Sequence, residues 1–191
     1  MIANTIPATI FMISFIFYFY LHSFLNFWAE TLKFGDRMFY TDWWNSVSYG
    51  EFYKTWNIVV GDWLKTYIFY EAKNMIKPPF NNYIAATLAI TISSIIHEYI
   101  MYVAVGSFCP VVSFTFGMFG LLLKFFTPDI TSNTKHRIWN LLFWVSFSFG
   151  NSINITLYSL ETALSSSCTI QKNSIFDYLR PKFTFSQCYG H

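Results

Sequence analysis

The chain has 191 residues, of which 54% are hydrophobic, 23% are aromatic and 12% are charged, and its formal net charge is +2. Soluble domains carry about 25% charged residues, so this composition excludes an ordinary soluble domain. The small net charge and the lack of any run of lysine and arginine exclude a nucleic-acid partner. We therefore expect a polytopic all-α protein in the lipid bilayer.

Four apolar segments are candidates to cross the membrane, at 8–32, 83–105, 110–126 and 138–160. A helix of roughly 20 apolar residues spans the hydrocarbon core of a bilayer. The first segment has no charged side chain before Glu30, and it lacks the basic flank and the cleavage site of a signal peptide. The sequence therefore predicts four transmembrane helices, the first of them a true span.

Residues 33–82 carry charged side chains throughout, which argues against a membrane span. Within this segment, apolar and aromatic residues recur with the period of a helix: Trp56, Val59, Val60, Trp63, Leu64 and Tyr67. This pattern predicts one or more amphipathic helices that lie at the membrane surface or re-enter the bilayer.

The positions of lysine and arginine predict the orientation, because short loops rich in these residues stay in the cytoplasm. Six of the twelve basic residues lie in 33–82 and three in 124–137, which makes nine on one side against three in the tail. We therefore expect 33–82 to be cytoplasmic and the tail, 161–191, to be lumenal. Cys168 and Cys188 in that tail are either free thiols or a disulfide, which an oxidising compartment permits.

His97 is the main candidate for chemistry, because ionisable residues at membrane depth are usually functional. A neutral imidazole in a low-dielectric cavity can act as a general base toward a hydroxyl group. The alternative is a hydrogen-bonded packing histidine. Ser93 lies one turn earlier on the same face of the predicted helix. Glu98 lies on a different face, and we expect it to meet a cation or another polar partner rather than to assist catalysis.

The sequence favours direct transfer from an activated acyl donor, because no serine elbow is present and Cys109 falls at a predicted lumenal turn. Asn45, Asn57 and the tryptophan indoles can donate hydrogen bonds to a developing oxyanion, and aromatic walls can hold an aliphatic chain. Without the histidine, we would interpret the same tryptophans as an aromatic belt at the membrane interface. No cysteine or histidine spacing indicates a metal site.

Three motifs carry a resemblance to a known family. They are FYTDWWN at 39–45, TWN at 55–57 and HEY at 97–99 in an apolar segment. In this order they resemble the membrane-bound O-acyltransferase family. The flanking stretch LHSFLNFWAETLKFGDRMF and the tail sequence NSIFDYLRP between two cysteines resemble its sterol O-acyltransferase branch more than its diacylglycerol branch. The resemblance extends over nearly the whole chain.

The resemblance implies an endoplasmic-reticulum enzyme that moves a fatty acyl group from acyl-CoA to a sterol hydroxyl. Acyl-CoA is then a co-substrate, no other cofactor and no metal are expected, and we expect a homo-oligomer. By motif match, His97 is the catalytic histidine and Asn57 assists it. The residues matched to substrate binding are Asp42, Trp43, Trp44, Asn45, Trp56 and Ser93. The family's lumenal disulfide corresponds to Cys168 and Cys188.

Two departures from the family pattern qualify this reading. Gly61 stands where sterol O-acyltransferases carry histidine, so one polar contact, toward the CoA moiety, is expected to be missing. The chain also corresponds to the C-terminal part of a single family domain. Two alternatives therefore stay open: a diacylglycerol O-acyltransferase, and a truncated, non-catalytic membrane subunit or regulator.

We predict that a reporter fused after His191 is lumenal and that one inserted within 75–80 is cytoplasmic, because of the basic asymmetry. Protease protection of the two reporters in sealed microsomes measures this directly. Two reporters on the same side of the membrane would contradict the four-span arrangement.

Overall fold

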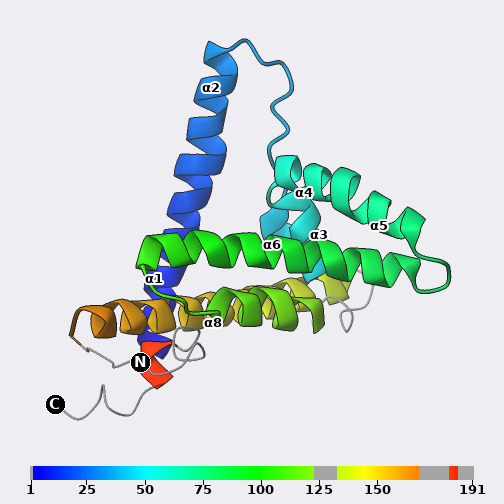
Figure 1. Ribbon diagram of the computed structural model, residues 1–191. Coiled ribbons are helices and arrows are strands. Elements are labelled where there is room, and N and C mark those ends of the chain that lie inside the picture. Colours follow the sequence, from blue (N-terminus) through cyan, green and yellow to red (C-terminus); the bar gives the residue numbers. More distant parts are fainter. Residues whose placement is uncertain (1, 123–132, 168–180, 185–191) are drawn as a thin grey trace.

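The computed structural model describes residues 2–122, 133–167 and 181–184. Within these ranges all regular structure is helical, which confirms the predicted all-α class (Figure 1). The elements in chain order are α1 (Ile2–Phe15), η1 (Ile16–Phe24), α2 (Leu25–Thr31), η2 (Trp43–Asn45), α3 (Tyr49–Thr55), α4 (Ile58–Leu64), η3 (Lys65–Phe69), α5 (Tyr70–Met75), α6 (Asn81–Val105), η4 (Ser113–Phe119), α8 (Asn133–Ser167) and η5 (Lys182–Thr184).

The first helix is one continuous column built from α1, η1 and α2, in which η1 has the wider turns of a π-helix. Its stretch Asn4–Thr31 is long and apolar enough to cross a membrane, as predicted for 8–32. Figure 1 shows that α1 lies beside α8, whereas α2 stands clear of the other helices. Most of the column's large apolar side chains are exposed, as expected for a surface that faces lipid.

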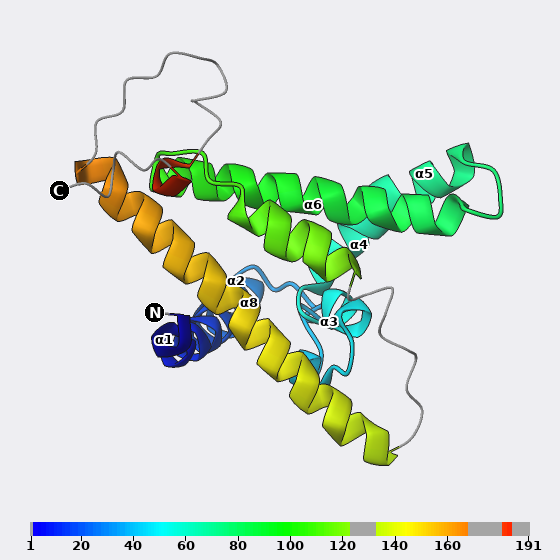
Figure 2. The ribbon, with the colours of Figure 1, turned by 90° about the horizontal axis from the view of Figure 1, so that it is seen from below.

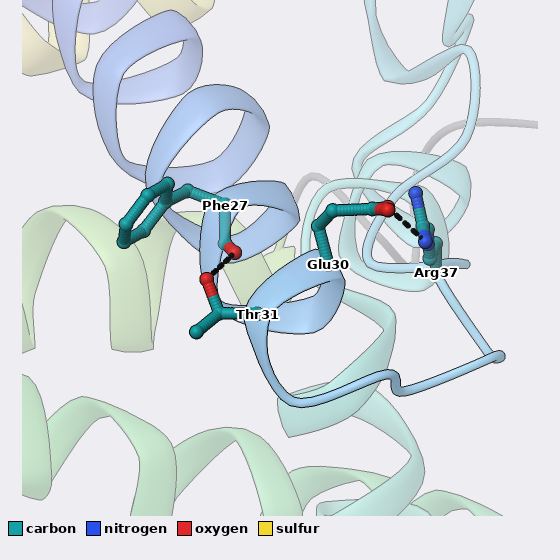
Figure 3. A network of polar contacts seen from close by, with 4 residues as sticks. All are labelled: Phe27, Glu30, Thr31 and Arg37. Atoms are coloured by element: carbon teal, nitrogen blue, oxygen red, sulfur yellow. Dashed lines mark hydrogen bonds and ion pairs between the residues drawn. The ribbon is translucent and has the colours of Figure 1, made fainter.

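The column ends in a short polar cluster (Figure 3). Thr31 Oγ1 donates a hydrogen bond to the Phe27 carbonyl, one turn earlier in the helix, at 2.8 Å. Glu30 forms an ion pair with Arg37 of the following loop. Both side chains are exposed, and such surface pairs contribute little to stability. The cluster therefore marks where the apolar column meets the polar segment.

α6 is the second helix of membrane-spanning length and composition, and its bounds agree closely with the predicted 83–105. It ends at Gly106, which has φ of 75°. Glycine adopts this left-handed conformation at little cost and commonly terminates helices. The Gly106 N–H donates to the Tyr102 carbonyl at 2.9 Å.

Among the described residues, two helices at the predicted positions 8–32 and 83–105 have the length and composition to cross a membrane. For 110–126, the described part includes only the shorter apolar helix Ser113–Leu122. For 138–160, α8 is a long helix, but its asparagine, serine and threonine side chains keep it outside the hydropathy range of the other two. The span count of four stays a prediction.

The polar segment 33–82 forms short helices, as the amphipathic pattern predicted. α4, η3 and α5 follow one another without a break from Ile58 to Met75. Val59, Trp63 and Tyr67 are exposed along this helix, which leaves an aromatic stripe free to meet the membrane surface.

Polar side chains join α1 to α8. Thr9 Oγ1 and Ser152 Oγ lie 3.1 Å apart with both residues fully buried, and Thr5 Oγ1 lies 3.2 Å from Thr156 Oγ1. Small hydroxyl residues let helix backbones approach closely, and they hydrogen-bond across membrane helix interfaces. This interface holds the first column against α8 in the crossing seen in Figure 2.

Gly117 of η4, and Gly120 directly after it, allow close contacts with neighbouring segments. A Cβ at Gly117 would lie 2.7 Å from Ser94 Oγ of α6, and a Cβ at Gly120 would overlap the hydroxyl of Tyr53. Burial raises the pKa of the Tyr53 phenol. The absence of side chains at these positions brings α3 and α6 against η4.

The predicted bridge between Cys168 and Cys188 lies outside the described residues and stays a prediction. Cys109 is a buried free thiol.

We predict that Gly120→Ala destabilises the protein by about 1–3 kcal/mol, the usual cost of overpacking. Removing the Tyr53 hydroxyl in the double variant Tyr53→Phe/Gly120→Ala should recover most of this loss, because the Tyr53 ring carbon lies 3.5 Å from the added Cβ. Thermal unfolding in detergent measures both effects.

Gly150→Ala is the matched control, because a Cβ there meets nothing within 4 Å. It should stabilise α8 by about 0.5–1 kcal/mol, as alanine does relative to glycine inside a helix. Equal losses at positions 120 and 150 would contradict the close packing of Tyr53.

Candidate active site

The tryptophan motif forms the centre of an aromatic core. Trp43 is 4% exposed, and its ring centroid lies between 4.7 and 6.1 Å from those of five other aromatic side chains: Phe17, Trp44, Phe52, Trp56 and Trp144. These rings come from η1, η2, α3 and α8, so one indole joins parts of the chain that are far apart in sequence. Its Nε1–H finds no acceptor within the described ranges. Trp43 is thus mainly a core residue.

The backbone after Trp43 is held by the N-terminal part of α8. Asn140 Nδ2 donates to the carbonyls of Trp44 and Ser46, each at 2.9 Å, and Trp144 Nε1 donates to the Trp44 carbonyl at 3.0 Å. Figure 2 shows this end of α8 reaching the region of α3. The loop that carries Asp42, Trp44 and Asn45 is therefore fixed by side chains about a hundred positions away, while these three side chains stay exposed.

Two of the sequence motifs lie side by side. The Thr41 N–H donates to the Thr55 carbonyl, and the Ile58 N–H donates to the Phe39 carbonyl, both at 2.9 Å. These bonds tie the segment before the paired tryptophans to the one around Asn57. The tryptophan motif and the asparagine motif therefore form one structural unit, although nine residues separate them.

Asn57 has a structural role that also orients its amide group. It is the N-cap of α4, and its Oδ1 accepts the Val60 N–H at 3.2 Å. Asparagine is among the favoured residues at this position because its oxygen satisfies a free helix amide. Since the oxygen is used, the amide nitrogen Nδ2 is left to donate. The side chain is half-buried.

The His97 ring has a defined tautomer. Nδ1 lies 2.7 Å from the carbonyl oxygen of Ser93, one turn earlier on α6. A carbonyl can only accept, so Nδ1 carries the proton, and in a neutral imidazole Nε2 is then free to accept one. The predicted proximity of Ser93 is therefore confirmed, through its carbonyl. The imidazole itself lies on the exposed face of α6, not among the buried residues described.

A chain of ring contacts connects His97 to the tryptophan core. Phe116 of η4 lies 5.4 Å from the His97 ring and 5.2 Å from Tyr53, and Tyr53 lies 5.8 Å from Phe52, which contacts Trp43. Neither Phe116 nor Tyr53 was indicated by any motif or pattern in the sequence. Within the described ranges, no hydrogen bond joins His97 to Asn57, and the ring contacts lead from the histidine to the core of the tryptophan motif.

Among the residues that the structure describes, the partners of Glu98 are uncharged polar groups, in agreement with the expectation of a cation or another polar partner. Its Oε2 accepts the Ser113 N–H at 2.9 Å and its Oε1 accepts the Tyr158 hydroxyl at 2.8 Å. Sequence reasoning did not single out Tyr158, because no feature local to it indicates a contact with Glu98, sixty positions earlier. Burial raises the pKa of the Cys109 thiol to about 12, so this residue is a poor nucleophile.

Gly61 has space around it. A Cβ there would meet the Tyr53 carbonyl oxygen at 3.6 Å, which is ordinary van der Waals contact. The position next to Asp62 on α4 therefore does not require glycine for packing.

Comparison with known proteins agrees with the motifs. Sterol O-acyltransferase 1 of Cricetulus griseus is 38% identical over 180 residues, which cover 94% of this chain and 32% of that protein. Sterol O-acyltransferase 2 of Mus musculus is 37% identical over 175 residues, which cover 91% of this chain and 32% of that protein. Sterol O-acyltransferase 2 of Homo sapiens is 35% identical over 178 residues, which cover 93% of this chain and 33% of that protein. The chain spans about a third of the length of these relatives.

The sequence profile of the membrane-bound O-acyltransferase family matches residues 2–160, which include all three motifs and most of α8. The chain is a membrane protein that belongs to the membrane-bound O-acyltransferase family.

Proposed function

We propose that the protein provides the catalytic part of an acyltransferase that moves a fatty acyl group from acyl-CoA to a sterol hydroxyl. The observation that carries the proposal is the geometry of His97, whose Nδ1–H is bound to a backbone carbonyl while Nε2 is left free on an exposed face of a membrane helix. The names of the relatives support a sterol as the acceptor. We place the enzyme in the endoplasmic reticulum, and we expect it to assemble as a homo-oligomer.

His97 acts as the general base. The sterol hydroxyl oxygen attacks the thioester carbonyl carbon while its proton moves to Nε2. The carbon–sulfur bond then breaks, and the proton passes to the leaving thiolate to give the sterol ester and free CoA. The Ser93 carbonyl stabilises the imidazolium, because it accepts the Nδ1–H that becomes more acidic as Nε2 is protonated. No covalent acyl-enzyme is needed.

Asn57 provides a hydrogen bond to the thioester carbonyl oxygen. Its Oδ1 is held by the cap of α4, so Nδ2 is directed by the fold and loses little freedom when it donates. Such preorganised donors stabilise the oxyanion more than mobile ones do. We expect the substrate to lie between His97 and Asn57 and to complete the site.

Substrate binding divides between two kinds of residue. Trp43, Trp56 and Ser93 act through packing, because Trp43 and Ser93 are buried and Trp56 contacts the Trp43 ring at 4.7 Å. Asp42, Trp44 and Asn45 present exposed side chains that can contact acyl-CoA.

We predict that His97→Gln lowers turnover per folded molecule by about 10²- to 10⁴-fold, the usual effect of losing a general base, with acyl-CoA binding unchanged. The assay uses a full-length chimera in which this chain replaces the matching third of the hamster sterol O-acyltransferase 1, with labelled acyl-CoA and competing sterol and diacylglycerol acceptors. A packing histidine predicts lower folded yield with near-parent turnover. Transfer of the labelled acyl group into triacylglycerol, and not into sterol ester, would favour the alternative of a diacylglycerol O-acyltransferase.

A second prediction separates the two roles of Asn57. Asn57→Asp keeps the oxygen that caps α4 but removes the donor, so turnover should fall by about 10²-fold or more while the thermal midpoint stays near that of the parent. Asn57→Ala removes both the donor and the capping oxygen. Turnover should therefore fall as in Asn57→Asp, and the protein should also lose about 1 kcal/mol of stability. If Asn57→Asp keeps near-parent turnover, the amide is not an oxyanion donor.

A further inference from the structure

Glu98 is a buried carboxylate whose two oxygens are both satisfied by distant parts of the chain. The residue is 6% exposed, and its partners are the Ser113 amide and the Tyr158 hydroxyl. The Tyr158 oxygen is also 3.4 Å from the Val112 N–H, which donates to it. Burying a carboxylate without partners is costly, so these bonds are required for the observed arrangement. They join α6, the start of η4 and α8 at one point.

Glu98 follows His97 directly, so the position of one fixes the position of the other. Successive residues of a helix lie about 100° apart around its axis. With Glu98 held inward by α8 and η4, α6 cannot rotate, and the exposed His97 side chain is held about 100° away around the helix axis.

The same bonds also fix the other side of the His97 ring. Ser113, whose amide binds Glu98, begins η4, and Phe116 of that helix packs against the imidazole at 5.4 Å. If the bond to Glu98 is lost, α6 and η4 are free to shift relative to each other. The contact between His97 and Phe116 would then loosen.

We propose that Tyr158, acting through Glu98, is a positioning residue for His97. This inference rests on the proposed role of His97 as the base. Tyr158 does not touch the reacting atoms: its hydroxyl accepts from the η4 backbone and donates to Glu98, and so it sets the direction in which Nε2 points. Misplacing a catalytic group by about 1 Å can cost 10²-fold in rate.

The first test is kinetic and uses the same full-length chimera. Tyr158→Phe removes one hydroxyl and should lower kcat per folded molecule by about 10- to 100-fold while KM for acyl-CoA stays within about twofold of the parent. Tyr102→Phe is the matched control, because it removes an exposed hydroxyl from α6 itself, and it should leave both constants unchanged. A kcat within twofold of the parent in Tyr158→Phe overturns the proposal.

If Tyr158→Phe folds poorly because Glu98 keeps an unpaired charge, the double variant Glu98→Gln/Tyr158→Phe removes that charge. It should fold and still show the loss in kcat. Glu98→Gln alone keeps an oxygen for the Ser113 amide and an amide that can donate to Tyr158, so it should retain more turnover than the double variant. Full turnover in the double variant would overturn the proposal.

The second test needs no acyl transfer, so it separates this inference from the proposed function. Nitrogen NMR of the histidine-labelled chain in lipid nanodiscs reports which ring nitrogen of His97 carries the proton. The parent should show a single tautomer protonated at Nδ1, and Tyr158→Phe should shift both ring signals toward their averaged values, while His22, on η1, stays unchanged. An unaltered His97 spectrum overturns the positioning role even if the enzyme is active.

Discussion

The burial of the Trp43 indole is the packing interaction on which the rest of the site depends. Trp43 lies where η1, α3 and α8 meet, and its ring contacts residues from each of them. Aromatic pairs in such edge-on and tilted arrangements add to the free energy gained from burial. The core is also continuous, through Phe52, Tyr53 and Phe116, with the ring of His97. The tryptophan motif thus supports the histidine through packing.

A second constraint comes from the bilayer, where polar groups must find partners inside the protein. The described helices meet it with small hydroxyl residues between α1 and α8, and with the bonds from Tyr158 and Ser113 to Glu98. Glu161, which is fully buried on α8, accepts the Phe183 N–H at 3.3 Å and so joins η5 to the same helix. Each bond links segments that are far apart in sequence. Polar pairs therefore fix how the helices sit against one another, and apolar side chains remain for the lipid.

The sequence predicted features that depend on local properties. The helix with His97 was located within two residues, because a long and mainly apolar run that is followed by glycine leaves few alternatives. The proximity of Ser93 and His97 followed from helix periodicity, and the amphipathic helix after Asn57 followed from its pattern.

Other features could not be predicted because they arise from contacts between distant residues. Nothing local to Tyr158 indicates that its hydroxyl reaches Glu98, sixty positions earlier. The burial of Trp43 depends on Trp144, and the loop after it depends on Asn140, both on α8. The exposure of His97 was also not expected, since a polar residue in an apolar helix usually faces inward.

The central claim is that His97 Nε2 receives the acceptor proton while Asn57 holds the thioester oxygen. A cryo-electron microscopy map of the assembled enzyme, with a sterol and a non-transferable thioether analogue of acyl-CoA, tests it most directly. The account predicts the sterol oxygen at hydrogen-bond distance from Nε2, about 2.6–3.2 Å, with the analogue passing between His97 and Asn57. A sterol bound elsewhere, with Nε2 facing only lipid, would contradict it.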